Sequence, residues 1–162
     1  MITQVVVGNT LYPLIEGQPV QFTAGDTLKI LYSFKYKMPE QMAGVRVWAS
    51  CYRYTLGILN RASDAQTKGT IILEKAEDWT VFSGEIDIII PQKAGIITGL
   101  WGLIVELPDY EDVDGNAVEE HIDNCLEATT PPGIFDMIVP LLGLGLMMFI
   151  TKSTGEEGGM LG

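Results

Sequence analysis

The fold class follows from residues 27–37, TLKILYSFKYK, and from residues 45–55, VRVWASCYRYT. In the first stretch Leu28, Ile30 and Tyr32 alternate with other residues, which is the period-2 pattern of a strand with one buried face. The second stretch repeats the alternation and is rich in aromatic and β-branched residues, which favour strands over helices. Both stretches therefore predict long β-strands.

Outward from these two strands, short apolar runs alternate with turns made of Gly, Pro, Asn and Asp. The polar stretch NRASDAQTKG, residues 60–69, is predicted to be a loop. Strands joined by turns, with no helical segment between them, predict an all-β sandwich or barrel. The same pattern disfavours a parallel α/β sheet. The predicted further strands are residues 2–7, 11–16, 20–23, 70–73, 81–90, 100–107 and 118–126.

Three segments resemble immunoglobulin-like domains. FTAGDTLKILYSFKY is similar to their opening strands, VRVWASCYRY places Trp48 where they often carry a tryptophan, and FSGEIDIIIPQKAGIITGLWGLIVEL is similar to their fifth and sixth strands. The resemblance implies an antiparallel β-sandwich over residues 20–128. Cys51 follows Trp48 instead of preceding it, so the usual Cys–Trp–Cys order is absent. A jelly-roll-type sandwich stays open as a second topology.

The 162 residues divide by composition into four parts. Residues 1–128 are the predicted sandwich and residues 129–133 a linker. Residues 134–151 form a predicted C-terminal apolar helix, and residues 152–162 a polar tail. From residue 134 to residue 150 the segment has 17 residues and one charge. As a helix it would measure about 25 Å, slightly less than the ~30 Å hydrocarbon core of a bilayer.

This C-terminal segment has two compatible interpretations, a transmembrane helix and a helix buried between copies in a homo-oligomer. Pro and Gly, which disfavour a helix in water, are tolerated in membrane helices. Four of its residues lie at successive spacings of four, three and four: Asp136, Pro140, Gly143 and Met147. In a helix they would share one narrow face, on which two helices can approach closely. The residues predicted to make membrane or oligomer contacts are Ile134, Phe135, Asp136, Pro140, Gly143 and Met147.

The net charge of −11 comes mainly from residues 101–130, which carry nine acids and no base. Such a surface repels phosphate backbones, so we expect no nucleic-acid partner. The segment PDYEDVDGNAVEE offers hard oxygen ligands for calcium, the one cofactor that the sequence suggests. Its spacing departs from the EF-hand pattern, and the alternative is a D-G hairpin turn with solvated acids. The candidate calcium ligands are Asp109, Glu111, Asp112, Asp114 and Asn116.

The residues that usually carry catalysis are few. Cys51 and Cys125 are compatible with one disulfide or with two buried thiols, and His121 is the single imidazole. The sequence contains no nucleophile elbow, phosphate loop or metal-binding motif. We therefore expect that the protein is not an enzyme.

Strand parity predicts an interaction surface. Trp48, Tyr52 and Tyr54 fall on one face of residues 45–55, opposite an aliphatic face that suits the core. Aromatic side chains on an outward face are typical of binding surfaces. We expect these three side chains to be exposed or covered by a partner.

Together these patterns predict a structural or assembly protein. A β-sandwich would be tethered by its C-terminal helix to a membrane or a homo-oligomer, as a component of a virion or a surface layer. The alternative is a cell-surface binding module, either an adhesin or a calcium-dependent carbohydrate-binding domain. The N-terminus has neither a basic segment nor a long apolar run, so no secretory signal peptide is predicted.

Overall fold

The alternating side chains of two long strands, β4 (Thr27–Met38) and β5 (Met42–Thr55), meet in one core. Leu28 and Ile30 of β4 and Val47 and Cys51 of β5 are fully buried, as their strand parity predicts. The computed structural model describes residues 1–91 and 98–129, within the compact unit Met1–Thr129.

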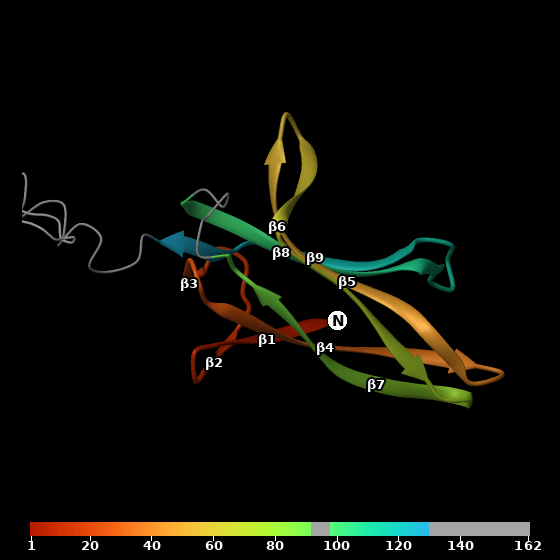
Figure 1. Cartoon of the computed structure of the whole chain (residues 1–162). Coiled ribbons are helices and arrows are strands. Elements are labelled where there is room, and N and C mark those ends of the chain that lie inside the picture. Colours follow the sequence, from red (N-terminus) through yellow and green to blue (C-terminus); the bar gives the residue numbers. More distant parts are fainter. Residues whose placement is uncertain (92–97, 130–162) are drawn as a thin grey trace, which may run out of the picture. The chain divides into compact units, whose positions relative to one another are not determined.

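The described residues form nine strands in two sheets, so the all-β prediction is confirmed (Figure 1). The first sheet has the order β2-β1-β4-β7 and the second has the order β3-β9-β8-β5-β6. Side chains from both sheets share the hydrophobic core, which makes the architecture sandwich-like. Besides β4 and β5, the strands are β1 (Ile2–Val7), β2 (Thr10–Pro13), β3 (Val20–Thr23), β6 (Ile58–Leu73), β7 (Ala76–Ile89), β8 (Gly99–Glu111) and β9 (Ala117–Thr129).

One strand pair departs from the predicted antiparallel arrangement. β3 runs parallel to β9, with Val20 opposite Leu126 and Thr23 opposite Thr129, whereas the other strand pairs are antiparallel. The chain passes from β2 in the first sheet to β3 in the second, and β3 then covers the edge of β9. The hydroxyl of Thr23 donates to the carbonyl of Thr129 at 3.0 Å, and the hydroxyl of Thr129 donates to the carbonyl of Phe22 at 3.2 Å.

The prediction of a loop at residues 60–69 is wrong, because these residues lie within β6. β6 is the edge strand beside β5, and Arg46 to Ser50 of β5 pair in register with residues 66–70. Pairing with β5 keeps this polar sequence in a strand. Its Ala65 side chain packs into the core. Strand propensity therefore depends here on the tertiary partner more than on composition.

Residues 134–151, the predicted membrane or oligomer helix, lie outside the described residues, and that helix stays a prediction. Within the described residues, no helix has the length and apolar character needed to cross a bilayer.

Cys51 and Cys125 are buried free thiols rather than a disulfide. Cys125 donates a hydrogen bond from Sγ to the carbonyl oxygen of Ile122 at 3.3 Å. Burial raises the pKa of both thiols, that of Cys125 to about 12. Because the thiolate is the reactive form, both groups are protected by burial and by their protonation state.

We expect that neither native thiol of the folded full chain reacts appreciably with a disulfide reagent at pH 8, and that both react in guanidinium chloride. Val113→Cys is the matched control, since Val113 is 81% exposed and its replacement adds an accessible thiol. Absorbance of the released thiolate measures each rate. A native thiol that reacts as fast as the engineered one would show that the core opens readily.

Candidate interaction site

The far end of the β5–β6 hairpin stands out from both sheets (Figure 1). Thr55 pairs with Ile58, so two residues, Leu56 and Gly57, make the connection. Both have positive φ angles, 53° for Leu56 and 79° for Gly57, as a two-residue hairpin turn that follows the strand twist requires. Glycine adopts this region without strain, whereas a leucine there costs roughly 1–2 kcal/mol.

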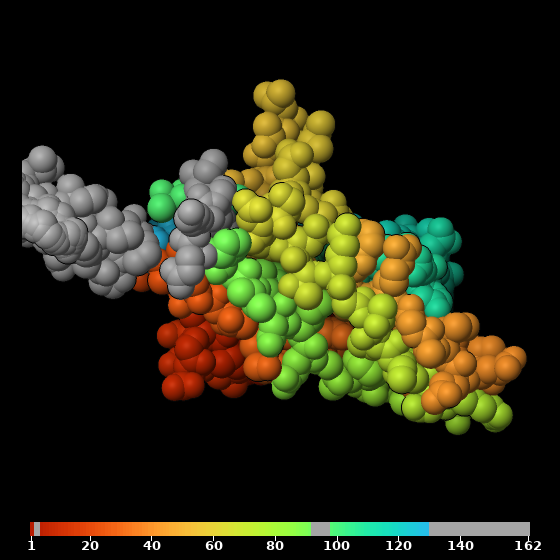
Figure 2. All heavy atoms as spheres, viewed as in Figure 1, coloured from red at the N-terminus to blue at the C-terminus, as the bar shows by residue number. Residues whose placement is uncertain are grey.

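The residues around this turn are apolar and exposed. Leu56 is 97% exposed, Ile58 65% and Tyr54 51%. The space-filling view shows the hairpin projecting into solvent (Figure 2). We refer to residues 54–58 as the hairpin tip. A large apolar side chain in strained backbone at an exposed turn adds little to folding stability, so the hairpin tip is the candidate interaction site.

The outer side of the hairpin base is fixed by Tyr52. Its side chain is 1% exposed, and its hydroxyl donates a hydrogen bond to the carboxylate of Asp123. The ring lies so close to Gly102 that a Cβ at that position would overlap it. Burial, followed by the hydrogen bond with Asp123, raises the pKa of Tyr52, so the phenol keeps the proton that it donates.

A bulge in β9 presents Asp123 to this tyrosine. Trp101 faces Leu126 and Leu103 faces Ile122, so one residue of β8 lies opposite three residues of β9. Within these three, Asn124 has a φ of 51°, a left-handed conformation that asparagine tolerates better than most residues. Bulges of this kind redirect side chains, and this one lies beside the Tyr52–Asp123 contact.

The other side of the hairpin base is fixed by Arg53. Its guanidinium lies 4.1 Å from the ring centroid of Trp101. It also donates from Nε to the carbonyl of Leu100 at 3.0 Å and from Nη2 to the carbonyl of Thr98 at 2.8 Å. Tyr52 and Arg53 therefore hold β5 to β8 on both faces immediately before the strand leaves the sheet.

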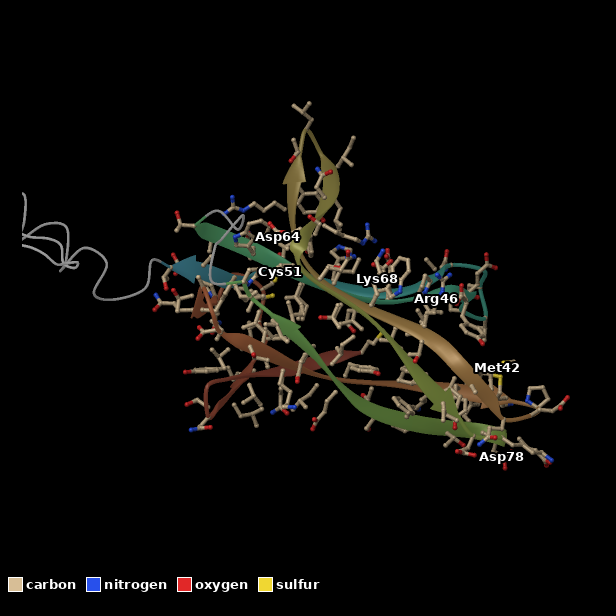
Figure 3. All side chains as sticks on the ribbon, viewed as in Figure 1. Met42, Arg46, Cys51, Asp64, Lys68 and Asp78 are labelled. Atoms are coloured by element: carbon tan, nitrogen blue, oxygen red, sulfur yellow. The ribbon has the colours of Figure 1, made fainter. Side chains whose placement is uncertain are left out.

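The three aromatic side chains predicted to form one surface differ in exposure in the structure. The expectation of an exposed side chain is wrong for Tyr52, which is buried, whereas Tyr54 is exposed and packs its ring edge-on to Tyr52 at 5.6 Å. Trp48 is partly exposed and lies near two cations, 5.2 Å from the Arg46 guanidinium and 4.5 Å from the Lys68 ammonium. Figure 3 labels Arg46 and Lys68, both beside the second sheet.

Sequence reasoning missed Leu56 and Ile58. Their signal was the Leu-Gly pair between alternating segments, which marks a possible two-residue hairpin, although Asn-Gly is the stronger form of that signal.

Two of the candidate calcium ligands have other partners. Asp109 accepts a hydrogen bond from Nε of Arg46 at 2.8 Å, and this bond lowers the pKa of Asp109. Asp112 accepts from the backbone N–H groups of Asp114 at 2.8 Å and Asn116 at 2.9 Å. The bond from the N–H of Asn116 contributes most to the lowered pKa of Asp112. Asp109 therefore links β8 to β5, and Asp112 stabilises the β8–β9 turn.

The remaining candidates, Glu111, Asp114 and Asn116, are exposed around the same turn. In the part of the chain that the structure describes, no group of three or more His, Cys, Asp or Glu side chains is placed to hold a metal ion. Calcium binding at this turn stays a prediction from the sequence.

Comparison with known proteins gives no assignment: no protein-family model matches the chain, and no curated protein matches it.

We expect Gly102→Ala to destabilise the protein by about 1–3 kcal/mol, because the new methyl group overlaps the Tyr52 ring. Gly69→Ala is the matched control on another strand of the same sheet. Its Cβ would lie 3.7 Å from the nearest atoms, which is ordinary contact. Urea unfolding of the full chain measures both changes. Equal midpoints for the two variants would show that Tyr52 is not locked against Gly102.

Proposed function

We propose that this chain is a non-enzymatic structural or assembly protein. Its sandwich binds a protein surface through the hairpin tip, and residues 134–151 tether it to a membrane or to neighbouring copies. In this role it is a component of a virion or a surface layer. The cell-surface binding module is the competing function, and it predicts a foreign ligand in place of self-assembly.

The observation that carries the proposal is the apolar hairpin tip. Leu56 is nearly fully exposed at a position where asparagine would relieve backbone strain. Two anchors, Tyr52 with Asp123 and Arg53 with Trp101, support the hairpin at its base. A rigid apolar projection of this kind loses little conformational entropy when it docks.

The strand order supports an immunoglobulin-like sandwich as the finer fold. In that fold the third, sixth and seventh strands share one sheet, and variable-type domains extend this sheet beyond the third strand. The order β9-β8-β5-β6 corresponds to that extended sheet, and β1-β4-β7 corresponds to the opposite one. The cysteines depart from the pattern, since Cys51 is on β5 and Cys125 on β9.

The chemistry around the hairpin supports binding over catalysis. The hydroxyl of Tyr52 is hydrogen-bonded to Asp123, and the guanidinium of Arg53 is hydrogen-bonded to two backbone carbonyls. These groups hold the hairpin in place, and the raised pKa of Tyr52 disfavours the phenolate that a nucleophilic mechanism would need.

The tether rests on the composition of the C-terminal segment. Seventeen residues with one charge would expose a large apolar surface if they were left in water. We therefore propose that either lipid or neighbouring copies cover this segment.

Leu56→Asn tests the hairpin tip, because it should separate stability from association. We expect it to raise the free energy of unfolding by about 1 kcal/mol by relieving left-handed strain. We expect the same substitution to weaken association of the full chain at least tenfold. Urea unfolding and sedimentation velocity in a non-ionic detergent measure the two effects.

The matched control is Ile89→Asn, which removes another apolar side chain, 69% exposed, from β7. Association should be unchanged in this control. If Leu56→Asn associates as the unmodified chain does, the hairpin tip is not the docking element.

The tether is tested by flotation of the full chain with phosphatidylcholine vesicles. We expect the unmodified chain to float, and Leu141→Lys with Leu144→Lys to remain at the bottom, because each lysine near the middle of a span costs about 2.5–3.5 kcal/mol. Flotation of both proteins would contradict insertion of this segment. If the unmodified chain does not float with the vesicles, lipid does not cover residues 134–151, and neighbouring copies are the cover that the proposal then requires.

A further inference from the structure

A second apolar feature lies at the other end of the β5–β6 hairpin. A cavity of about 350 Å³ opens there, near the β4–β5, β6–β7 and β8–β9 turns. Figure 3 labels Met42 at this end of β5 and Asp64 near the base of the projecting hairpin. We refer to the cavity as the end pocket. Its apolar lining includes Phe34, Tyr36, Leu73, Leu107, Tyr110 and Val118.

The end pocket exists because the core is incomplete at this end. Along the inner face of β4 Tyr32 is 3% exposed, whereas Phe34 and Tyr36 further along the same face are only partly buried. The β4 rings continue as an aromatic row, with Phe34 6.2 Å from Tyr36 and 5.3 Å from Phe82. A hollow whose lining includes partly exposed aromatic side chains such as Phe34 and Tyr36 has the character of a binding pocket.

We propose that the hairpin tip of one copy inserts into the end pocket of the next copy. This contact rests on the assembly function proposed above and names the partner as a second copy of this chain. The tip is narrow, because two residues join its strands, and it presents Leu56 and Ile58 as apolar side chains. The pocket offers the apolar lining that these side chains lack within their own chain.

The contact must form between copies. β5 runs from Met42, near the pocket, to Thr55, next to the tip. Thirteen residue steps along a strand span roughly 40 Å, so a tip cannot reach the pocket of its own chain. Two different surfaces therefore meet, which makes the interface heterologous. Such an interface builds a ring if the rotation between copies closes, and an open filament if it does not.

Charge supports this pairing. Residues 52–63, which carry the tip, contain two arginines and no acid. Residues 108–117, which form one side of the pocket mouth, contain four acids and no base. The opposite side of the mouth carries Lys35 and Lys37, and the ammonium of Lys37 lies 5.1 Å from the Trp79 ring centroid. Arg61 is ion-paired with Glu106 of its own chain at 2.7 Å, and Arg53 is hydrogen-bonded to carbonyls of β8, so the opposite charges orient an inserted hairpin toward the acidic β8–β9 turn and add little to its affinity.

Disulfide cross-linking of the full chain, in non-ionic detergent with a mild oxidant, tests the contact. One copy carries Leu56→Cys at the tip, and the other carries Val113→Cys, which is 81% exposed at the pocket mouth. The native thiols are buried and should not compete. We expect a cross-linked dimer from the mixture, little dimer from either variant alone, and a ladder of multimers from the chain that carries both substitutions.

Leu56→Cys mixed with Ile89→Cys is the matched control, since Ile89 is exposed on β7 and does not line the pocket. This mixture should give little cross-linked dimer. Burial of the native thiols in each variant, measured with the same disulfide reagent, shows that the variant is folded. Cross-linking of Leu56→Cys to itself or to Ile89→Cys as efficiently as to Val113→Cys would overturn the proposed contact.

Sedimentation of the same samples separates this contact from the assembly function. If the chain associates but tip and pocket do not cross-link, the contact is wrong and assembly stands. If the chain is monomeric at every concentration, both proposals are wrong.

Discussion

The close contact between the Tyr52 ring and the backbone of Gly102 is the constraint on which the candidate interaction site depends. The side chain at position 102 must be absent for the ring to lie against β8, and the bulge in β9 must bring Asp123 to the phenol. On the other face of β5, Arg53 holds Trp101 and two carbonyls. A strand fixed on both faces can leave its sheet in one direction, so the hairpin beyond it is positioned rather than free.

The sequence was sufficient for the fold class and for the main core rows, because β4 and β5 follow the period-2 rule closely and are flanked by turn residues. It failed where the outcome depends on a distant partner. The composition of residues 60–69 is typical of a loop, but pairing with β5 makes them a strand. The parallel β3–β9 pair depends on how the chain crosses between the two sheets. Parity placed Tyr52 on the outer face correctly, but no local pattern indicates that Gly102 and Asp123 cover it there.

The two ends of the β5–β6 hairpin show complementary departures from ordinary packing. At one end apolar side chains project into solvent from a strained turn, and at the other the core stops short of filling the space between the strands. Each departure alone reduces stability, because the exposed leucine and the uncovered aromatic lining of the end pocket both lose the free energy that burial of apolar surface provides. A contact between copies would satisfy both. The tether proposed for residues 134–151 is compatible with such a contact between copies in one assembly.

The most direct test is whether the Leu56 side chain becomes covered when copies of the full chain assemble. Hydroxyl-radical footprinting read by mass spectrometry measures this cover at dilute and concentrated protein, with Ile89 as an exposed reference on β7. The proposal predicts that oxidation of Leu56 and Ile58 falls severalfold as assembly proceeds, while oxidation of Ile89 is unchanged. Equal oxidation of Leu56 in dilute and assembled protein would contradict the docking role of the hairpin tip.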